Sequence, residues 1–498
     1  MKLFSKIILL VVIGCFSISP VYARQDTKEA IVKVYTVYDE HDYGEPWKMV
    51  GQQRRTGSGC IIEGKRILTN AHVVGDQTFI QVKRAGQVKK YVAEVEAVAH
   101  ECDLALLKVA DEAFFSGVEP LKIGSLPEVK DKVIVYGFPT GGDKLCITEG
   151  IISRVEYQRY AHSGIPLLTC QMDAAINPGS SGGPVVKNDE IVGVAFQAAE
   201  GENIAYMVPA PVIKRFLKDI SDGSYEGIPA LGVLWQSMEN PSIRFKYNMQ
   251  KEQSGVLIVR IIPDSAAAKV LKPGDILLSI EGRDIGNDGT IKFRNDERIY
   301  FSYAIQSKYI GDSVRLKILR RGRVIPMRIR LTNLLTSCHL VPYMQYDTSP
   351  TYYIVGGLVF QPLTMNYLQS WPDLSYAPSN LVNYCLNGQI SKERKQVIVL
   401  TKVMADEINV DYEWLEDEVI SRVNGKKIST MKDLVQAVEE NTGKYDVFIV
   451  EGTGRQIVLD KDGLSEANRR ILERYKIDLD RSEDLKDIRL RRMSDCTD

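Results

Sequence analysis

The sequence predicts a mostly β protein with several domains, in which an all-β unit is followed by smaller α+β units. From residue 27 to about residue 222, short apolar runs follow one another with turn residues between them. Examples of these runs are residues 30–37, 59–62, 77–83, 91–99 and 132–137. Such spacing is typical of a β-sandwich or a pair of β-barrels. A chain of 498 residues is too long for one core, so we expect about three domains.

A glycine-rich and proline-rich stretch stands out in the first unit, at residues 177–184 (NPGSSGGP). Apolar runs at 167–172 and 191–196 flank it and are predicted to be buried strands. Glycine permits turns in which several backbone N–H groups point to one spot. A serine at that spot, Ser181, could attack a carbonyl carbon while the N–H groups hold the resulting oxyanion. Taken alone, the stretch is equally typical of a β-turn with a surface serine.

Two motifs upstream supply partners for this serine. Residues 68–74 (LTNAHVV) place His72 at the end of an apolar run, and residues 102–109 (CDLALLKV) place Asp103 at the head of another. The order His, Asp, Ser is that of chymotrypsin-type proteases. In such a triad His72 takes the proton of Ser181 and returns it to the leaving amine. Asp103 holds the imidazole in the right tautomer and stabilises the imidazolium.

These three motifs resemble those of the Deg/HtrA family of trypsin-like serine proteases, which carry TNAHVV, DLALL and GNSGGP segments. The resemblance implies a chymotrypsin-like double β-barrel over residues 24–222, a serine endopeptidase activity, and no cofactor. It also implies catalysis by His72, Asp103 and Ser181. The chain departs from the family at Ser180, where Asn is usual. That side chain points away from the chemistry in relatives, so we expect the departure to matter little.

The oxyanion hole is predicted at the backbone of the same stretch. We expect the N–H groups of Gly179 and Ser181 to be its donors, with Ser180 beside them. Relatives have active and inactive forms of this loop, and the sequence leaves open which form is resting. In the family, a loop equivalent to residues 38–56 reports on neighbouring subunits, so this polar stretch is either regulatory or a mobile surface loop.

The predicted specificity pocket is small and uncharged. Trypsin has an acid at the pocket floor, about six residues before the nucleophile, and this chain has Ala175 there, followed by Ile176. A later wall of the pocket is expected at Phe196 and Ala198. Such a pocket favours small or medium apolar side chains over Lys and Arg. These side chains are buried in folded proteins and exposed in unfolded ones.

Residues 230–335 have the pattern of a PDZ domain. A strand at 254–262 is followed by a short helix that opens near residues 263–267, and then by the turn and strand of residues 271–280. We expect a loop upstream to hold a peptide carboxylate with its backbone N–H groups, the peptide adding as a strand. The residues of this loop are Leu231, Gly232 and Val233. The alternative is a structural or oligomerising module.

Residues 336–460 are predicted to form a second, more divergent PDZ-like domain, with an insertion at 363–387. A second carboxylate-binding loop is expected at Gly356, Gly357 and Leu358. The same structural alternative applies to this unit. The stretch 461–498 carries both signs of charge and is expected to form a solvated helical tail, with packing on a neighbouring subunit as an alternative.

The first 23 residues have the features of a secretory signal peptide. A positive start is followed by an apolar run at 7–13 and by a small-residue cleavage site that ends at Ala23. As an alternative, Cys15 could be acylated as in a lipoprotein. No later stretch approaches the ~20 apolar residues of a membrane span. We therefore expect export to the periplasm of a bacterial envelope.

The balance of charges and the spacing of the cysteines restrict which binding partners, metal sites and disulfides are expected. The chain has 63 Lys and Arg against 64 Asp and Glu, which gives no reason to expect nucleic acid. Of the 8 cysteines, an odd number remains once Cys15 is set aside, and their spacing fits no zinc site. We expect no metal and assign no disulfides.

Together these patterns predict an exported serine endopeptidase that degrades unfolded or damaged envelope proteins in protein quality control and the stress response. Its PDZ domains would bind peptide segments and regulate activity or assembly. The resemblance implies a homo-oligomer, a trimer or a larger assembly. The alternative is a peptide-binding chaperone or adaptor on a protease scaffold with little hydrolysis. An intact set of His72, Asp103 and Ser181 favours the enzyme.

Overall fold

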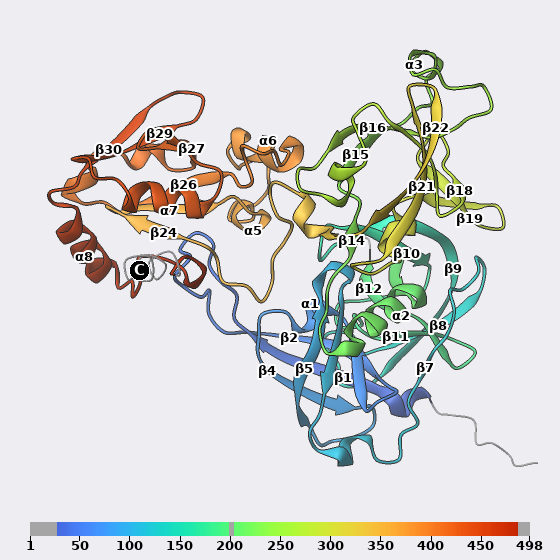
Figure 1. Cartoon of the computed structure of the whole chain (residues 1–498). Coiled ribbons are helices and arrows are strands. Elements are labelled where there is room, and N and C mark those ends of the chain that lie inside the picture. Colours follow the sequence, from blue (N-terminus) through green and yellow to red (C-terminus); the bar gives the residue numbers. More distant parts are fainter. Residues whose placement is uncertain (1–26, 199–203, 487–498) are drawn as a thin grey trace, which may run out of the picture.

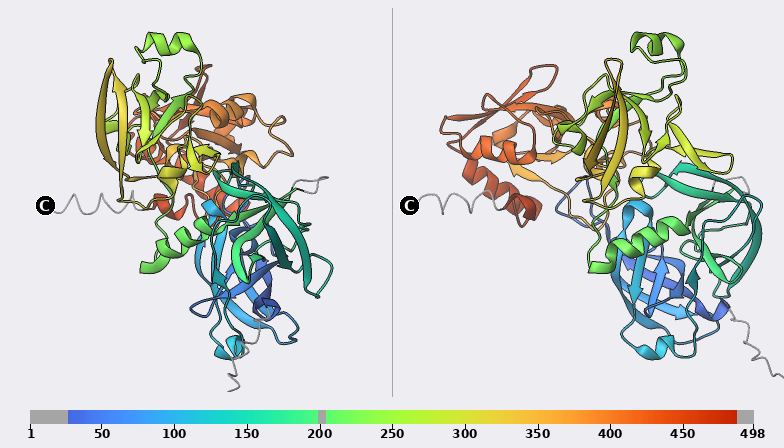
Figure 2. Two further views of the ribbon diagram at one scale, coloured as in Figure 1. Left: turned by 90° about the vertical axis from the view of Figure 1, so that its right-hand side faces the viewer. Right: turned by 45° about the vertical axis from the view of Figure 1, so that its right-hand side comes forward.

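The structure, a computed structural model, describes residues 27–198 and 204–486. The expected signal peptide and Cys15 lie outside the described residues. The chain is mostly β, as predicted. Figure 1 shows the two barrels of the first unit, in blue to green, below a green and yellow unit and an orange and red unit. Figure 2 shows the same arrangement from two other sides.

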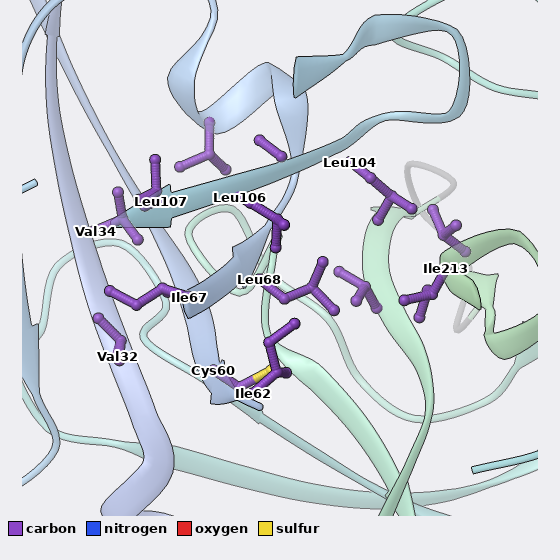
Figure 3. Close-up of a cluster of buried hydrophobic side chains, with 14 of the residues drawn as sticks. Val32, Val34, Cys60, Ile62, Ile67, Leu68, Leu104, Leu106, Leu107 and Ile213 are labelled. Carbon is purple, nitrogen blue, oxygen red and sulfur yellow. The ribbon is translucent and has the colours of Figure 1, made fainter. Parts of the chain in front are cut away.

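The first barrel is closed, with strand order β1-β2-β3-β6-β5-β4. Alternate residues of its strands, such as Val32, Val34 and Ile67, are buried and fill the interior (Figure 3). Its strands are β1 (Ile31–Tyr38), β2 (Gln53–Ile62), β3 (Arg66–Thr69), β4 (Gln77–Arg84), β5 (Tyr91–Ala99) and β6 (Leu104–Lys108). Its helical turns are η1 (Thr27–Ala30), α1 (Ala71–Val74), η2 (His100–Cys102) and η3 (Glu112–Phe115).

The second barrel is a sheet of order β11-β8-β9-β10-β13-β12-β7 that closes through an extra pairing of β11 with β12. Its strands are β7 (Lys122–Ile123), β8 (Lys132–Gly137), β9 (Cys146–Arg159), β10 (Pro166–Met172), β11 (Pro184–Lys187), β12 (Glu190–Ala198) and β13 (Ala205–Pro209). Helix α2 (Ala210–Asp219) and η4 (Ile220–Asp222) follow. Ile213 of α2 packs with Leu104 and Leu68 of the first barrel, so one core joins both barrels (Figure 3). The double β-barrel prediction is confirmed.

The next unit is a five-stranded antiparallel path, β15-β16-β17-β21-β22, with β18 paired to β17. Asp275 in its predicted turn is buried, and both carboxylate oxygens accept hydrogen bonds of 2.6 Å from Arg320. Its strands are β14 (Pro229–Ala230), β15 (Val233–Gln236), β16 (Val256–Ile261), β17 (Ile276–Ile280), β18 (Arg283–Asp284), β19 (Thr290–Arg294), β20 (Glu297–Tyr300), β21 (Ser313–Arg320), β22 (Arg323–Arg330) and β23 (Asn333–Leu334). Its helices are α3 (Pro241–Lys246), η5 (Ala266–Lys269) and α4 (Tyr303–Gln306).

The last unit repeats this architecture with sheet order β24-β25-β26-β27-β29-β30. The expected insertion forms two short helices on its flank, α5 (Met365–Leu368) and α6 (Ser379–Asn387). Its strands are β24 (Tyr353–Val355), β25 (Leu358–Pro362), β26 (Ile398–Val403), β27 (Glu418–Val423), β28 (Lys426–Lys427), β29 (Tyr445–Val450) and β30 (Gln456–Asp460). The remaining helices are η6 (Thr336–Cys338), η7 (Glu407–Asn409), η8 (Glu413–Leu415), α7 (Met431–Glu439), α8 (Leu464–Tyr475) and η9 (Glu483–Leu485).

The polar stretch at residues 38–56 reaches across to this last unit. The backbone oxygen of Tyr43 accepts a hydrogen bond of 3.0 Å from Gln361, and Lys402 pairs with Glu45 at 2.8 Å. The rings of Trp47 and Tyr352 meet edge to face at 6.1 Å. The stretch is therefore docked within its own chain, in contrast to the alternative of a mobile surface loop.

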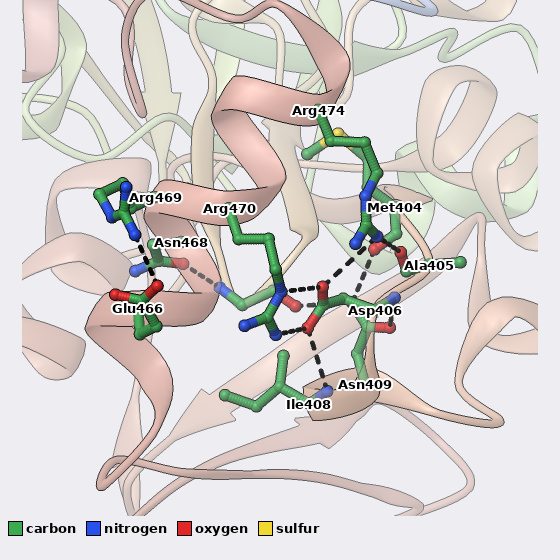
Figure 4. Close-up of polar contacts among 11 residues, drawn as sticks. Met404, Ala405, Asp406, Ile408, Asn409, Glu466, Asn468, Arg469, Arg470 and Arg474 are labelled. Carbon is green, nitrogen blue, oxygen red and sulfur yellow. Dashed lines mark hydrogen bonds and ion pairs between the residues drawn. The ribbon is translucent and has the colours of Figure 1, made fainter.

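As far as residue 486, where the described part of the chain ends, the charged C-terminal stretch is part of the last unit instead of a separate tail. Helix α8 buries Leu464, Ala467 and Ile471 against it. Two arginines of α8, Arg470 and Arg474, donate to the buried carboxylate of Asp406 (Figure 4). Residues beyond α8 then pair with β24, because the N–H of Ile354 donates to the oxygen of Asp480 at 2.7 Å. The expected solvated helix thus has one buried face, which the sequence analysis did not predict.

We predict that Asp406→Asn loosens α8. Asp406 also caps the N-terminus of η7, and the amide can keep that role. The amide loses the charge that both arginines bind, and hydrogen bonds to charged groups are the stronger ones. The apparent Tm should fall by roughly 3–6 °C, with faster amide hydrogen exchange in α8. The control is Glu466→Gln, an exposed partner of Arg469 on the same helix, which should change the Tm by about 1 °C or less. Equal Tm values for both variants would contradict this account.

Candidate functional site

His72 and Asp103 meet at the junction of the two barrels. His72 lies on α1, the short helix that follows β3, and Asp103 ends the turn η2 just before β6. The carboxylate faces His72 with both oxygens. One oxygen accepts a hydrogen bond from the imidazole Nδ1 at 2.8 Å, and the other accepts one from the backbone N–H of His72 at 2.9 Å. The ring and the main chain of His72 are therefore fixed by the same side chain.

Asp103 is fully buried and held in a demanding conformation. Its φ of 53° is in the left-handed region, which aspartate tolerates better than most residues. The side chain of Asn70, also fully buried, donates a 2.7 Å hydrogen bond to its backbone oxygen. Burial acts to raise the pKa of Asp103, but the charge and hydrogen bonds of His72 outweigh it and hold that pKa below its ordinary value. The carboxylate is thus ionised where His72 needs a negative partner.

Ser181 lies on a tight loop between β10 and β11. Its backbone oxygen accepts the N–H of Ser58, on β2, at 2.8 Å. The loop packs so closely that side chains are excluded after the serine. A Cβ on Gly182 would lie 2.1 Å from the oxygen of Ser58, and one on Gly183 would lie 2.0 Å from the oxygen of Tyr136. Both glycines are therefore required by close contact with one strand of each barrel, β2 at Ser58 and β8 at Tyr136.

The hydroxyl of Ser181 is not yet joined to the base. Among the described residues, no hydrogen bond links it to His72. Such bonds are often long in enzymes without substrate and tighten when substrate binds. The structure thus brings His72 and Asp103 into direct contact, and it places the serine loop beside them through Ser58 and the strand that leads to His72.

The peptide plane before Gly179 is clamped from one side. The oxygen of Pro178 accepts two hydrogen bonds from Thr140, one from its N–H at 2.7 Å and one from its hydroxyl at 2.9 Å. Because a peptide unit is planar and trans, the N–H of Gly179 points opposite to this oxygen. The φ of Gly179 is +93°, and a Cβ there would lie 2.6 Å from the oxygen of Phe138.

The next peptide plane is fixed by Ser58. Its buried hydroxyl donates to the oxygen of Gly179 at 2.7 Å and accepts the N–H of Phe138 at 2.8 Å. Ser180, predicted to lie beside the two donors, offers no donor of its own, because its N–H donates to the oxygen of Asn177 at 2.9 Å. Among the described residues, the N–H groups of Gly179 and Ser181 donate no hydrogen bond. Sequence reasoning missed Ser58 and Thr140, which belong to distant segments without a catalytic motif.

The residues predicted for the specificity pocket have different surroundings. Ala175 is exposed, and Ile176 is partly buried. Phe196 is 5% exposed and packs on Tyr160, with tilted rings whose centroids lie 4.5 Å apart. It is therefore largely a core residue, and its place in the pocket wall stays a prediction. The side chain of Ala198 lies outside the described part of the chain.

The first PDZ unit has a groove where the sequence predicted a peptide site. A cavity of about 240 Å³ runs along Leu231, Gly232 and Val233 and continues beside β15 and α4. Strand β15 is the last strand of its sheet on that side, so in the described chain its outer edge has no partner strand. Part of the lining comes from outside the unit, from Tyr157 and Pro166 of the second barrel and from Tyr343.

The predicted carboxylate loop of the second PDZ unit is already filled. The N–H of Gly356 donates at 2.6 Å to Asn468 on α8, and its oxygen accepts a 2.7 Å hydrogen bond from Asn409. Leu358 is fully buried, and a Cβ on Gly357 would lie 2.3 Å from Asn409. Residues 355–358 form the tight turn of the hairpin β24–β25, and α8 covers it. The prediction of a carboxylate site here was wrong, because Asn468 on the chain's own helix α8 takes the N–H of Gly356.

Comparisons with known proteins agree with this geometry. Residues 57–194 match the trypsin-like peptidase domain family, and residues 341–484 match the PDZ domain family. Putative protease Do-like 3, mitochondrial, of Arabidopsis thaliana is 39% identical over 458 residues, which covers 92% of this chain and 80% of that protein. Protease Do-like 2, chloroplastic, of the same plant is 39% identical over 462 residues, with 92% and 75% covered.

A more distant relative is the serine protease DegP homolog of Plasmodium falciparum, 28% identical over 82% of this chain and 58% of its own. Among solved structures, the HtrA-type protease AlgW with a tripeptide has a TM-score of 0.50 and 22% identity, covering 61% of this chain and 94% of that one. The match to the Do-like proteases spans nearly all of the described residues, both barrels and both PDZ units included. The chain therefore belongs to the Deg/HtrA family of trypsin-like serine proteases and is a serine endopeptidase.

Proposed function

We propose that His72, Asp103 and Ser181 form the catalytic triad and cleave peptide bonds in unfolded protein chains. The observation that carries this proposal is that buried Asp103 accepts hydrogen bonds from both Nδ1 and the backbone N–H of His72, at 2.8 and 2.9 Å. It leaves the second imidazole nitrogen as the free base. His72 takes the proton of Ser181 as its oxygen attacks the carbonyl carbon, and then gives that proton to the leaving amine. Water repeats the sequence on the acyl-enzyme.

The oxyanion is held by the N–H groups of Gly179 and Ser181, which have no other acceptor among the described residues. Thr140 and Ser58 set this geometry before substrate arrives, because they bind the two carbonyl oxygens on either side of Gly179. Donors that are oriented in advance need no rearrangement as charge develops. Ser58 and Thr140 are thus positioning residues for the oxyanion hole.

Unfolded segments are the proposed substrates. Ala175 and Ile176 offer an uncharged lining before the serine loop, which suits small apolar side chains. Such side chains become accessible when a protein unfolds. The groove of the first PDZ unit has a free strand edge beside a glycine turn, and this combination suits a peptide that adds as a strand. Because Tyr157 and Pro166 of the protease also line the groove, a bound peptide would touch the catalytic domain.

We propose an exported location, with damaged proteins of that compartment as substrates, and assembly into a homo-oligomer. The signal-like N-terminus supports export, and the mitochondrial and chloroplastic names of the relatives point to related compartments. None of the helices in the described ranges is long and apolar enough to cross a bilayer. A chaperone or adaptor with little hydrolysis is the competing function, but it has no use for the ordered His72–Asp103 pair.

The decisive test of the enzyme is Ser181→Ala. Because the nucleophile is lost, casein hydrolysis should fall by about 10³-fold or more, as should labelling by a fluorophosphonate probe. The matched control is Ser221→Ala, an exposed serine at the end of the protease unit, which should keep the wild-type rate. Equal casein hydrolysis by the wild type and Ser181→Ala would favour the chaperone or adaptor.

A second prediction concerns the buried hydroxyl of Ser58. In Ser58→Ala the oxygen of Gly179 and the N–H of Phe138 lose their partner, so the oxyanion donors are no longer held in place. We expect kcat to fall by about 10- to 100-fold with KM changed less than about twofold. Thr78→Ala, which removes an exposed hydroxyl bound to the oxygen of Val37, is the control. A change confined to KM would show that Ser58 acts on substrate binding.

A third prediction concerns specificity. Digestion of a denatured protein, followed by mass spectrometry of the fragments, should show cuts mainly after Val, Ala, Ile and similar residues. Ala175→Asp should add cleavage after Lys or Arg, because a carboxylate at the pocket floor pairs with a basic side chain. Dominant cuts after Lys or Arg by the wild type would contradict the uncharged pocket.

A further inference from the structure

The segment between β23, the last strand of the first PDZ unit, and β24, the first strand of the second, returns to the catalytic site. Two of its residues, Tyr346 and Asp347, lie between the loops that carry His72 and Asp103 and the last unit of the chain. We call these two residues the inter-PDZ clamp. Both residues precede β24 and lie far along the sequence from the protease residues that they contact.

Asp347 ties the two catalytic loops together. One carboxylate oxygen binds Nε2 of His100 at 2.8 Å, and the other accepts the N–H of Asp76 at 2.6 Å. In return, the carboxylate of Asp76 accepts the N–H of Asp347 at 2.7 Å. Asp76 lies just beyond the helix that carries His72, and His100 begins the turn that ends on Asp103. A single side chain therefore bridges the supports of the base and of its carboxylate partner.

Tyr346 covers a pair of histidines beside the base. Its ring stacks on His162 with centroids 3.9 Å apart and on His100 at 4.9 Å, and its hydroxyl donates to the backbone oxygen of His162 at 2.8 Å. The two histidines are joined at 2.9 Å through Nε2 of His162 and Nδ1 of His100. The ring of His162 in turn lies 5.9 Å from that of His72. Tyr346 thus packs on the residues that flank the catalytic imidazole.

The charges around this cluster suit a neutral His162. Burial lowers the pKa of His162 to about 3, so no second cation forms beside His72 when the latter accepts a proton. The other charged groups that face the cluster are those of Asp103, Asp76, Glu40 and Arg55. Arg55 donates to the backbone oxygens of His72 at 2.7 Å and of Gly75 at 2.9 Å, which holds the same helix from its other side.

We propose that Tyr346 and Asp347 are positioning residues for the catalytic base, supplied by the segment between the PDZ units. The proposal rests on the assignment of His72 as that base. It means that the orientation of the imidazole toward substrate depends on contacts made by residues outside the protease barrels. The second PDZ unit is therefore connected to the reaction centre without any peptide bound to it.

The test uses the full chain with the variants Asp347→Ala, Tyr346→Ala and Tyr346→Phe. Asp264→Asn is the matched control, since it removes an exposed carboxylate that faces Lys395 between the PDZ units at 3.8 Å. We expect Asp347→Ala and Tyr346→Ala to lower kcat by about 10- to 100-fold with KM within about twofold. Tyr346→Phe keeps the stacked ring and should restore at least about a third of the wild-type kcat. Asp264→Asn should match the wild type.

A structural readout accompanies the kinetics. The proton shared by Nδ1 of His72 and Asp103 should give a far-downfield proton NMR resonance, which should shift or broaden in Asp347→Ala but not in Asp264→Asn. Wild-type kcat in Asp347→Ala would overturn the proposal. A lower kcat with an unchanged resonance would overturn it too, because the effect would then be one of stability alone. Full activity of His72→Ala would instead overturn the assignment of the base, on which the proposal rests.

Discussion

The structure around the candidate site depends on one buried carboxylate. Asp103 has no solvent exposure, and both of its oxygens are used by His72. A buried charge is costly unless it is fully paired, so this arrangement persists only while the imidazole and the main chain of α1 stay in place. The hydrogen bond from Asn70 and the left-handed backbone at Asp103 also keep this carboxylate in place. The barrel junction is built to keep an ionised carboxylate beside a histidine.

The second constraint is that the two barrels of the catalytic domain are held by contacts with the rest of the chain. The 38–56 stretch leaves the first barrel to dock on the last unit, and the inter-PDZ clamp comes back to the catalytic loops. These two sets of contacts join the first barrel to the last unit and to the segment that precedes it. The first PDZ groove shares walls with the second barrel. Peptidase and PDZ units therefore form one connected system of contacts, which fits a protease whose activity responds to its other domains.

Much of this was accessible from the sequence, because local motifs determine local chemistry. The order of His72, Asp103 and Ser181 and the strand spacing led to the family and to the double barrel. The first PDZ groove followed from a glycine turn next to a strand. The position of Thr140 and Ser58 could not be predicted in this way, since each acts through backbone atoms of a distant loop. Nothing in a serine between two glycines, or in a threonine between a proline and a glycine, signals that role.

The features that were predicted wrongly or missed share one physical origin, which is contact between segments far apart in the sequence. The Gly356–Gly357 turn looks like the first carboxylate loop, but Asn468 on α8 takes its N–H group, and more than 100 residues separate the two. Phe196 lies within β12 and packs in the core on Tyr160, a partner that no local pattern reveals. Helix α8 carries many charges, yet its inner face packs on the last sheet. Tertiary contacts decided each of these cases.

The most direct test of the central claim is a structure of the protein with a peptidyl boronic acid, which copies the tetrahedral intermediate. The account predicts a covalent bond from boron to Oγ of Ser181. It further predicts one boronate oxygen within hydrogen-bond reach of the N–H groups of Gly179 and Ser181, and Nε2 of His72 beside Oγ, with Asp103 unmoved. Boron bound to another side chain, or an oxygen directed away from Gly179, would contradict it.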